Sequence, residues 1–291
     1  MQYHVNGDLV PASEATVSVE DRGFLYGDAA FETLRAYGGT VFEWDAHRER
    51  LVNTCDTLGM GSAVPADIHD RITATLDAND LADAYVRVSV TRGVQAGKLT
   101  PDPAVEPSVI VIVKPLPRGG VTGEDVWDAP ATVRTVDTRR IPEAAMPADS
   151  KTHNYLDGIL ARLELRGTDA DEALVRSVDG AVAEGATSNV FFVDGGALRT
   201  PALSEPILPG VTRRIVLDLA DEMGIPVETG TYGVESIRTA DEAFLTNTTW
   251  EVRPVATVDD DRVGGGPVTE RLADAFDRRV EASYRDCRNC R

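Results

Sequence analysis

The sequence predicts a mixed α/β fold (α/β with α+β character) built from two domains. Strand-like and helical segments alternate along the chain without the regular spacing of a doubly wound sheet. The 291 residues are enough for two domains, and a content of 42% hydrophobic and 26% charged residues is typical of a folded globular chain. A proline- and glycine-rich segment at 115–120 has the composition of a linker. We therefore predict an N-terminal α+β domain over 1–117, a linker over 118–123 and a C-terminal α/β domain over 124–291.

The first domain is predicted to begin with a hairpin and to contain three further strands. The hairpin reverses at Asn6-Gly7-Asp8, a sequence that favours a tight turn. Hydrophobic residues alternate strictly after Tyr85, so that Tyr85 and Arg87 should share one face of a strand while valines fill the other. The three predicted strands are residues 30–37, 85–91 and 108–114.

Two helices are predicted between the first two of these strands. Asp45 is expected to cap the first of them. The apolar face of this helix would contain Leu51, Cys55 and Leu58. The i+4 spacing of Ile68, Ile72 and Leu76 predicts the second helix.

The second domain is predicted to mix strands with three helices. The helices cover about 152–165 and 211–223 and a closing segment, all with apolar residues at helical spacing. The apolar stripe of the first helix consists of Leu156, Ile159, Leu160 and Leu163. The apolar face of the closing helix consists of Val268, Leu272, Ala275, Phe276 and Val280. The predicted strands lie near 126–136 and at 172–178, 188–194, 242–247 and 252–258.

The charge balance excludes several classes of function. A formal net charge of −19 repels nucleic-acid phosphates and anionic lipid surfaces, so we expect neither nucleic acid nor membrane as a partner. The start of the chain lacks the basic and apolar regions of a signal peptide, and cysteine is scarce, which favours a cytoplasmic location. Cys287 and Cys290 form a CxxC without a second pair, so no metal site is predicted. The excess of acidic residues over very few lysines is typical of a halophilic protein.

One of the three lysines occupies an unusual position. Lys98 lies in a predicted loop and Lys114 at a strand end, where an exposed charge is ordinary. Lys151 lies where a loop meets a predicted helix, in a chain that otherwise uses arginine. An amine can lose its proton and bond to a carbonyl carbon, which a guanidinium cannot do. Lys151 is therefore a candidate nucleophile, although a surface lysine at this position would give the same pattern.

Three other segments contain polar groups suited to binding an anionic cofactor. Glu184 lies among small residues just before an apolar strand, either as a functional acid or as a turn carboxylate facing water. Gly210 precedes a predicted helix whose first N–H groups could bind an anion. The hydroxyl-rich run 246–251 follows another strand and could donate to a phosphate or carboxylate.

Taken in order, these segments resemble the class IV aminotransferase family, which has fold type IV of the pyridoxal-phosphate enzymes. The resemblance extends nearly from end to end. The segments that carry it are Asp21–Asp28 (DRGFLYGD), Phe31–Arg35 (FETLR), His47–Leu51 (HRERL), Lys151–Leu156 (KTHNYL) and those around Glu184, Gly210 and Thr248. It implies an active site between the two domains, pyridoxal 5'-phosphate as coenzyme and a homodimer whose partner subunit touches each site.

The resemblance also implies roles for single residues. Lys151 would bond covalently to the coenzyme and move protons, Glu184 would pair with the ring nitrogen, and Arg50 would bind the phosphate. The other cofactor-binding positions that it implies are Tyr155, Val211, Thr212 and Thr248.

Within the family, local details resemble the aminodeoxychorismate lyases. Thr33 stands where branched-chain aminotransferases usually carry glycine, and its hydroxyl is similar to one that the lyases place near the catalytic lysine. The short spacing from Lys151 to Tyr155 is also lyase-like. The resemblance thus implies release of pyruvate and 4-aminobenzoate for folate biosynthesis, with Lys151 moving the proton and Thr33 assisting.

A branched-chain or broad L-amino-acid aminotransferase, acting with 2-oxoglutarate, is the alternative. Tyr85-Val86-Arg87 resembles the Tyr-x-Arg carboxylate site of those enzymes. The D-amino-acid pattern fits less well, because Phe31 replaces its usual tyrosine and 97–99 lacks its Arg-x-His. The expected substrate-binding residues are Tyr26, Tyr85, Arg87 and Thr249.

Overall fold

The computed structural model describes residues 1–95, 97–117 and 127–288, and the chain divides into two compact units. Unit 1 consists of Met1–Glu124, Ser150–Asn154 and Ser283–Arg291, and unit 2 of Asp125–Asp149 and Tyr155–Ala282. The short segment Ser150–Asn154, which contains Lys151, thus belongs to unit 1 although its neighbours in sequence belong to unit 2. The predicted linker over 118–123 lies outside the described residues.

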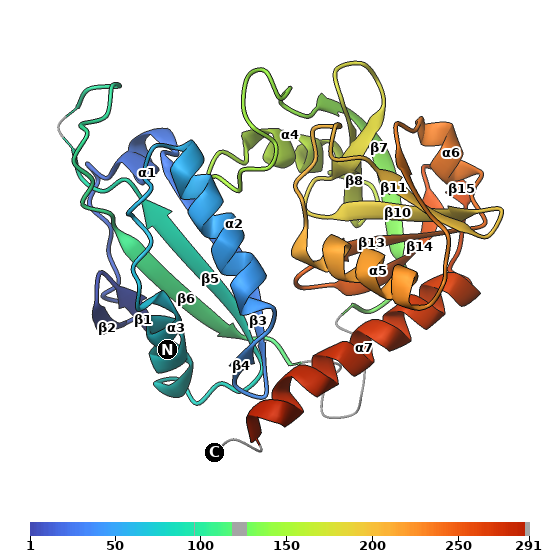
Figure 1. The fold of residues 1–291 in the computed structure, drawn as a ribbon. Coiled ribbons are helices and arrows are strands. Elements are labelled where there is room, and N and C mark those ends of the chain that lie inside the picture. The colour runs from blue at the N-terminus through green and yellow to red at the C-terminus, as the bar shows by residue number, and fades with distance from the viewer. Residues whose placement is uncertain (96, 118–126, 289–291) are drawn as a thin grey trace. The chain divides into compact units, whose positions relative to one another are not determined.

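Unit 1 is built on an antiparallel six-stranded sheet with the order β2-β1-β6-β5-β3-β4 (Figure 1). Its strands are β1 (Gln2–Val5), β2 (Asp8–Pro11), β3 (Ala29–Tyr37), β4 (Thr40–Val41), β5 (Ala84–Thr91) and β6 (Val109–Pro115). The predicted hairpin is confirmed: Val5 pairs with Asp8, and both turn residues have positive φ, 52° at Asn6 and 110° at Gly7. Such a turn matches the twist of the strands that it joins.

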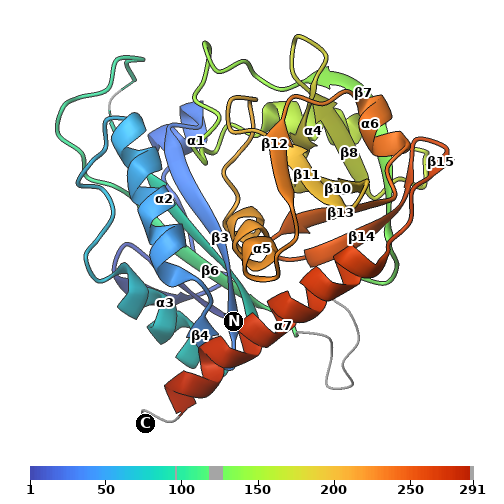
Figure 2. The same cartoon turned by 45° about the vertical axis from the view of Figure 1, so that its right-hand side comes forward.

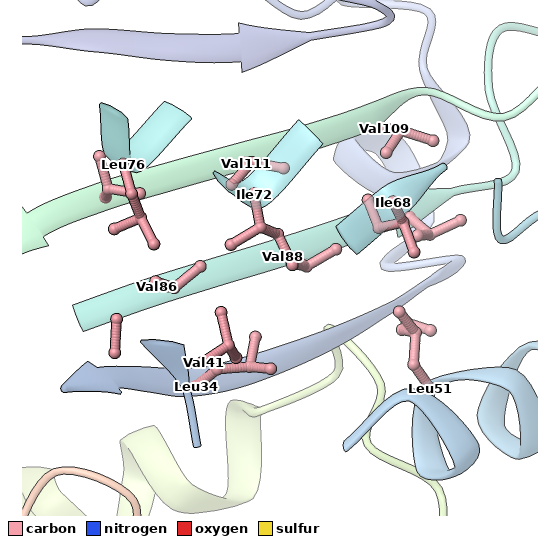
Figure 3. Packing of buried hydrophobic residues seen from close by; sticks show 14 of the residues in the cluster. Leu34, Val41, Leu51, Ile68, Ile72, Leu76, Val86, Val88, Val109 and Val111 are labelled. Carbon is pink, nitrogen blue, oxygen red and sulfur yellow. The ribbon is translucent and has the colours of Figure 1, made fainter. Parts of the chain in front are cut away.

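Two helices cover one face of this sheet, α2 (Trp44–Thr57) and α3 (Ile68–Asp77) (Figure 2). Figure 3 shows Ile68, Ile72 and Leu76 of α3 over the valines of the sheet. These three side chains of α3 are at most 1% exposed, as their i+4 spacing predicts. The valines that they cover include Val86, Val88 and Val111.

The start of α2 differs from the expected one. Asp45 lies in the first turn, and Glu43 occupies the N-cap position with a left-handed backbone (φ 50°) and without a side-chain cap. The acid at position 45 still suits the positive end of the helix dipole.

A short helix that the sequence did not predict, α1 (Arg22–Tyr26), precedes β3. The side chain of Asp21 caps this helix by accepting a hydrogen bond from the Gly23 amide at 2.7 Å.

Unit 2 contains a mixed nine-stranded sheet with the order β12-β11-β10-β13-β14-β7-β8-β9, and β15 pairs with β14. The strands are β7 (Ala131–Arg139), β8 (Glu172–Arg176), β9 (Val182–Gly185), β10 (Asn189–Asp194), β11 (Ala197–Pro201), β12 (Val227–Gly230), β13 (Glu242–Asn247), β14 (Glu251–Val258) and β15 (Asp261–Arg262). The helices are α4 (Leu156–Glu164), α5 (Val211–Glu222), α6 (Val234–Arg238) and α7 (Pro267–Arg288), of which α7 belongs to unit 2 as far as Ala282. Among the residues that the structure describes, no helix is both long and apolar enough to cross a membrane.

Helix α4 starts later than predicted, and its apolar stripe lies on the surface. It begins at Leu156 rather than at 152, because 151–153 pairs with β3 instead: the Phe31 amide donates to the Lys151 carbonyl and the His153 amide to the Ala29 carbonyl, both at 2.9 Å. The helix buries Gly158 and Ala161. Its apolar stripe is instead exposed, by 59% at Leu156, 54% at Ile159, 47% at Leu160 and 39% at Leu163.

Candidate active site

Lys151 is fixed to the sheet and to a helix of unit 1 through its backbone. Its amide donates to the hydroxyl of Thr54 in α2 at 3.0 Å, and its carbonyl accepts from Phe31 in β3. The Lys151 side chain is half-buried, and its Nζ lies 4.6 Å from the centre of the Phe31 ring. The backbone thus holds the amine of Lys151 over the face of the sheet to which Phe31 contributes.

The strand register gathers two of the predicted substrate residues, Tyr85 and Arg87, on that same face. Phe31 pairs with Ser89, Thr33 with Arg87 and Arg35 with Tyr85, and directly paired residues point to the same side of a sheet. The prediction that Tyr85 and Arg87 share a face is confirmed. One side of the sheet therefore presents a hydroxyl, a guanidinium and, through Phe31, the lysine amine.

Arg87 contacts an aromatic ring and a hydroxyl. Its Cζ lies 3.8 Å from the centre of the Phe31 ring, and its Nε donates to the Ser89 hydroxyl at 3.3 Å. Within the part of the chain that the structure describes, no carboxylate forms an ion pair with Arg87. Since the chain is strongly acidic, this half-buried guanidinium is suited to an anion from outside.

Arg50, the predicted phosphate ligand, is held by a buried acid that the sequence analysis did not single out. Its Nε and Nη2 donate to the two carboxylate oxygens of Glu32 at 2.7 and 2.8 Å, and His47 Nδ1 lies 2.8 Å from the second oxygen. Burial alone would raise the pKa of Glu32, but the charge and hydrogen bonds of Arg50, with His47, lower it to about 2. Burial lowers the pKa of His47, although the hydrogen bond and charge of Glu32 oppose that shift. The network keeps Glu32 ionised and fixes the orientation of Arg50.

Glu184 is a buried carboxylate in β9 of unit 2, not a turn residue facing water. One of its oxygens lies 3.1 Å from Nη2 of Arg140, and the other accepts from Nδ2 of Asn189 at 3.0 Å and the Leu208 amide at 3.1 Å. Burial would lower the pKa of Arg140, but the charges of Glu184 and Asp157 raise it. A guanidinium, a side-chain amide and a backbone amide thus fix the position of the Glu184 carboxylate.

The start of α5 lies beside this carboxylate. Gly210 is the N-cap, and no side chain caps the helix, so the first N–H groups, at Val211 and Thr212, have no side-chain cap as acceptor. A Cβ on Gly210 would meet Oδ1 of Asn189 at 2.1 Å, which only glycine avoids. Asn189 therefore contacts both Glu184 and the turn before α5, and it is a site residue that no sequence signal singled out.

The remaining predicted residues are placed as follows. In unit 2, Tyr155 precedes α4, and Thr248 and Thr249 lie in the turn between β13 and β14, where Oδ1 of Asn247 accepts from the Thr249 amide at 2.9 Å. In unit 1, Tyr26 ends α1 and is 45% exposed, and the Cζ of Arg22 lies 5.0 Å from the centre of its ring.

These groups fit pyridoxal 5'-phosphate by their chemistry. Lys151 supplies an amine for an aldehyde, Glu184 a buried anion for a ring N–H, and the start of α5 a set of N–H groups for a phosphate. The glycine at 210 makes room for the side chain of Asn189, which in turn donates to Glu184.

Comparison with known proteins identifies relatives along the whole chain. Residues 29–258 match the family described as amino-transferase class IV. A Methanocaldococcus jannaschii protein provisionally named a branched-chain-amino-acid aminotransferase is 36% identical over 280 residues, which cover 95% of each chain. The D-alanine aminotransferase of Staphylococcus haemolyticus is 32% identical and covers 96% of this chain and 97% of its own. The aminodeoxychorismate lyase of Bacillus subtilis is also 32% identical, with 96% and 94% covered.

The fold agrees with these relatives. The crystal structure of the branched-chain aminotransferase from Thermoproteus uzoniensis with norvaline matches with a TM-score of 0.89 at 30% identity, over 97% of this chain and 95% of that one. The match to the family model covers well over half of the residues. The chain belongs to the class IV aminotransferases, enzymes of fold type IV that depend on pyridoxal 5'-phosphate.

Proposed function

We propose that the chain is an aminodeoxychorismate lyase, which releases pyruvate and 4-aminobenzoate for folate biosynthesis. The observation that carries this proposal is the hydroxyl of Thr33 directly across from Arg87, on the face that Phe31 shares with Lys151. Cleavage of the enolpyruvyl ether needs a group that accepts a proton, a second group that carries one, and a cation that binds the substrate carboxylate.

The residues of this face divide the reaction among them. The Lys151 amine takes the proton from the amine-bearing ring carbon; the ether bond to the enolpyruvyl group then breaks, which leaves an aromatic ring. Lys151, assisted by the Thr33 hydroxyl, returns a proton to the released enol carbon and so gives pyruvate. Arg87 holds a substrate carboxylate. The coenzyme supplies a ring that withdraws electrons from the carbon losing its proton.

We further propose a role for each predicted coenzyme-binding residue. Its phosphate would be bound by Arg50, Thr248 and the amides of Val211 and Thr212, its ring nitrogen would pair with Glu184, and Tyr155 would lie near the ring. The buried Arg50–Glu32 pair and the uncapped start of α5 support these assignments.

A branched-chain or broad L-amino-acid aminotransferase is the second candidate. Arg87 favours it as well, since a guanidinium without an acidic partner suits the second carboxylate of glutamate or 2-oxoglutarate. The 36% identity to the Methanocaldococcus jannaschii relative supports the same alternative.

Two parallel assays on the coenzyme-loaded enzyme separate the candidates. We expect aminodeoxychorismate to yield pyruvate and 4-aminobenzoate in equal amounts without an added keto acid. We also expect leucine or glutamate alone to leave the absorbance of the coenzyme nearly unchanged. Thr33→Val should slow pyruvate release about tenfold or more, while Thr33→Ser keeps the hydroxyl and the rate. Amino transfer from leucine to 2-oxoglutarate without pyruvate release would instead establish the second candidate.

We also propose that the enzyme is a homodimer and that α4 contributes to the subunit contact. The stripe of Leu156, Ile159, Leu160 and Leu163 is 39–59% exposed, and four neighbouring apolar side chains on one helix face form a patch that water solvates poorly. A second copy of the chain would cover it.

Charged residues in this stripe should separate the subunits. We expect Ile159→Asp combined with Leu160→Glu to halve the mass measured by light scattering, because two buried charges would face an apolar surface. Val178→Asp is the matched control, since Val178 is 58% exposed but lies outside α4. An unchanged mass for the double variant would show that α4 is not at the interface.

A further inference from the structure

His153 contacts two residues that also contact Arg87; it lies in the segment Lys151–Leu156, but it was not among the predicted site residues. Its Nε2 lies 3.1 Å from the hydroxyl of Ser89, and its ring packs edge-on to Phe31 at a centroid distance of 5.6 Å. The side chain of Arg87 also contacts Phe31 and Ser89. Arg87 and His153 are therefore linked through both of them.

The direction of these hydrogen bonds follows from the chemistry of the groups. Arg87 can only donate, so its Nε–H uses a lone pair of the Ser89 oxygen. In the neutral tautomer of His153 that carries its hydrogen on Nδ1, Nε2 accepts the Ser89 hydroxyl hydrogen at 3.1 Å. Burial lowers the pKa of His153 to about 4, and the charge of Arg87 lowers it as well, so the ring is neutral and can accept. Arg87, Ser89 and His153 thus form one directed chain.

This chain fixes the remaining freedom of the guanidinium. Stacking on Phe31 sets the plane of the group, and the hydrogen bond at Nε sets its rotation within that plane. The two Nη groups are then left for a bidentate contact with a carboxylate.

We propose that His153 is a positioning residue that acts through Ser89 to orient Arg87 toward the substrate carboxylate. The proposal rests on the part of the proposed function that assigns a carboxylate to Arg87, and both candidate reactions share that assignment.

The test is the dissociation constant of two carboxylates, 4-aminobenzoate and 4-methylvalerate, with their neutral amides as matched ligands. The holoenzyme is titrated and binding is followed by its fluorescence or absorbance. His153→Phe keeps a ring beside Phe31 but cannot accept a hydrogen bond, and Ser89→Ala removes the link. We expect each to weaken carboxylate binding about tenfold and amide binding little. In turnover, KM should rise by a similar factor while kcat changes less than about twofold.

Three further variants make the result specific. His153→Gln retains an acceptor and should restore carboxylate binding. The double variant with His153→Phe and Ser89→Ala should be no weaker than either single variant, because both cut the same chain. His69→Phe is the control, since His69 packs on Trp44 and has no contact with this face among the described residues.

The proposal is overturned if His153→Phe binds carboxylates as tightly as the wild type, or if the amides weaken equally. It is also overturned if the wild-type enzyme binds neither carboxylate, or if Arg87→Gln leaves carboxylate binding unchanged. Failure of the proposed function is a separate result: carboxylate binding that depends on His153, without pyruvate release or amino transfer, would leave this proposal standing.

Discussion

Replacement of Lys151 by alanine is expected to lower turnover by at least 10²–10⁴-fold, the range that a positioned proton-transfer group contributes. The loss should be larger if the covalent bond to the coenzyme is also needed. Borohydride reduction of the wild-type holoenzyme should fix the coenzyme to one peptide, the one containing Lys151. In Lys151→Ala that label should disappear, together with the visible absorbance of the bound coenzyme.

The two other lysines provide a matched control. Lys98 and Lys114 are both exposed. Lys114 lies on the same sheet face as Phe31, but it pairs with Tyr85, four residues along β5 from Ser89, the partner of Phe31. Lys98→Ala and Lys114→Ala should therefore keep the label, the absorbance and turnover within about twofold. A label on either of these residues, or an unlabelled wild-type protein, would refute the role of Lys151 and leave only the fold.

Much of unit 1 could be predicted because its periodicity is uninterrupted. The alternation after Tyr85 fixed which residues face the core, and Val86, Val88 and Val90 are fully buried. The same alternation placed Tyr85 and Arg87 together on the other face, where the register confirms them. A period of two is decisive here because a shift by one residue would expose every valine.

The errors arise where tertiary contacts override local pattern. The helix was predicted to begin at about residue 152, but Thr152 and His153 pair with β3 instead, so α4 starts later than predicted. The leucine stripe of α4 has the spacing of a core helix, and the sequence alone does not tell a core-facing stripe from one left on the surface.

The residues that support the site could not be found from the sequence for a related reason. The contacts of these residues join positions up to 44 apart in the sequence, and the residues are Glu32, Asn189 and Arg140. A single acid, amide or arginine in a sequence gives no local indication of its partner. Glu32 lies in β3, a strand with many apolar residues. The alternation of side chains along this strand predicts that Glu32 faces the helix-covered side of the sheet, but it does not predict a partner there.

Glu32→Gln is expected to destabilise the folded enzyme by about 3–5 kcal/mol, the cost of removing one partner from a buried ion pair. Glu32 is 1% exposed and accepts from both Arg50 and His47, so the variant leaves the charge of Arg50 without its carboxylate. Equilibrium urea unfolding near pH 7 measures the loss. Glu49→Gln on the same helix as Arg50 is the control, because Glu49 is exposed, and it should change the free energy of unfolding by less than about 0.5 kcal/mol.

The pH dependence of that stability provides a second, independent test. The pKa of Glu32 is about 2 in the folded protein against an ordinary value of 4.5, so its contribution is fully present above pH 4.5 and is lost as the pH falls toward 2. The difference corresponds to ~3 kcal/mol of unfolding free energy. His47 also lowers the free energy of unfolding as the pH falls below 6.5, its ordinary pKa. The unfolded chain binds a proton at this histidine in that range, whereas burial lowers the pKa of the ring in the folded protein. Glu32→Gln should lack the component between pH 4.5 and 2, since glutamine does not titrate. A variant as stable as the wild type at pH 7, with the same steep loss in acid, would mean that Arg50 is held by something other than Glu32.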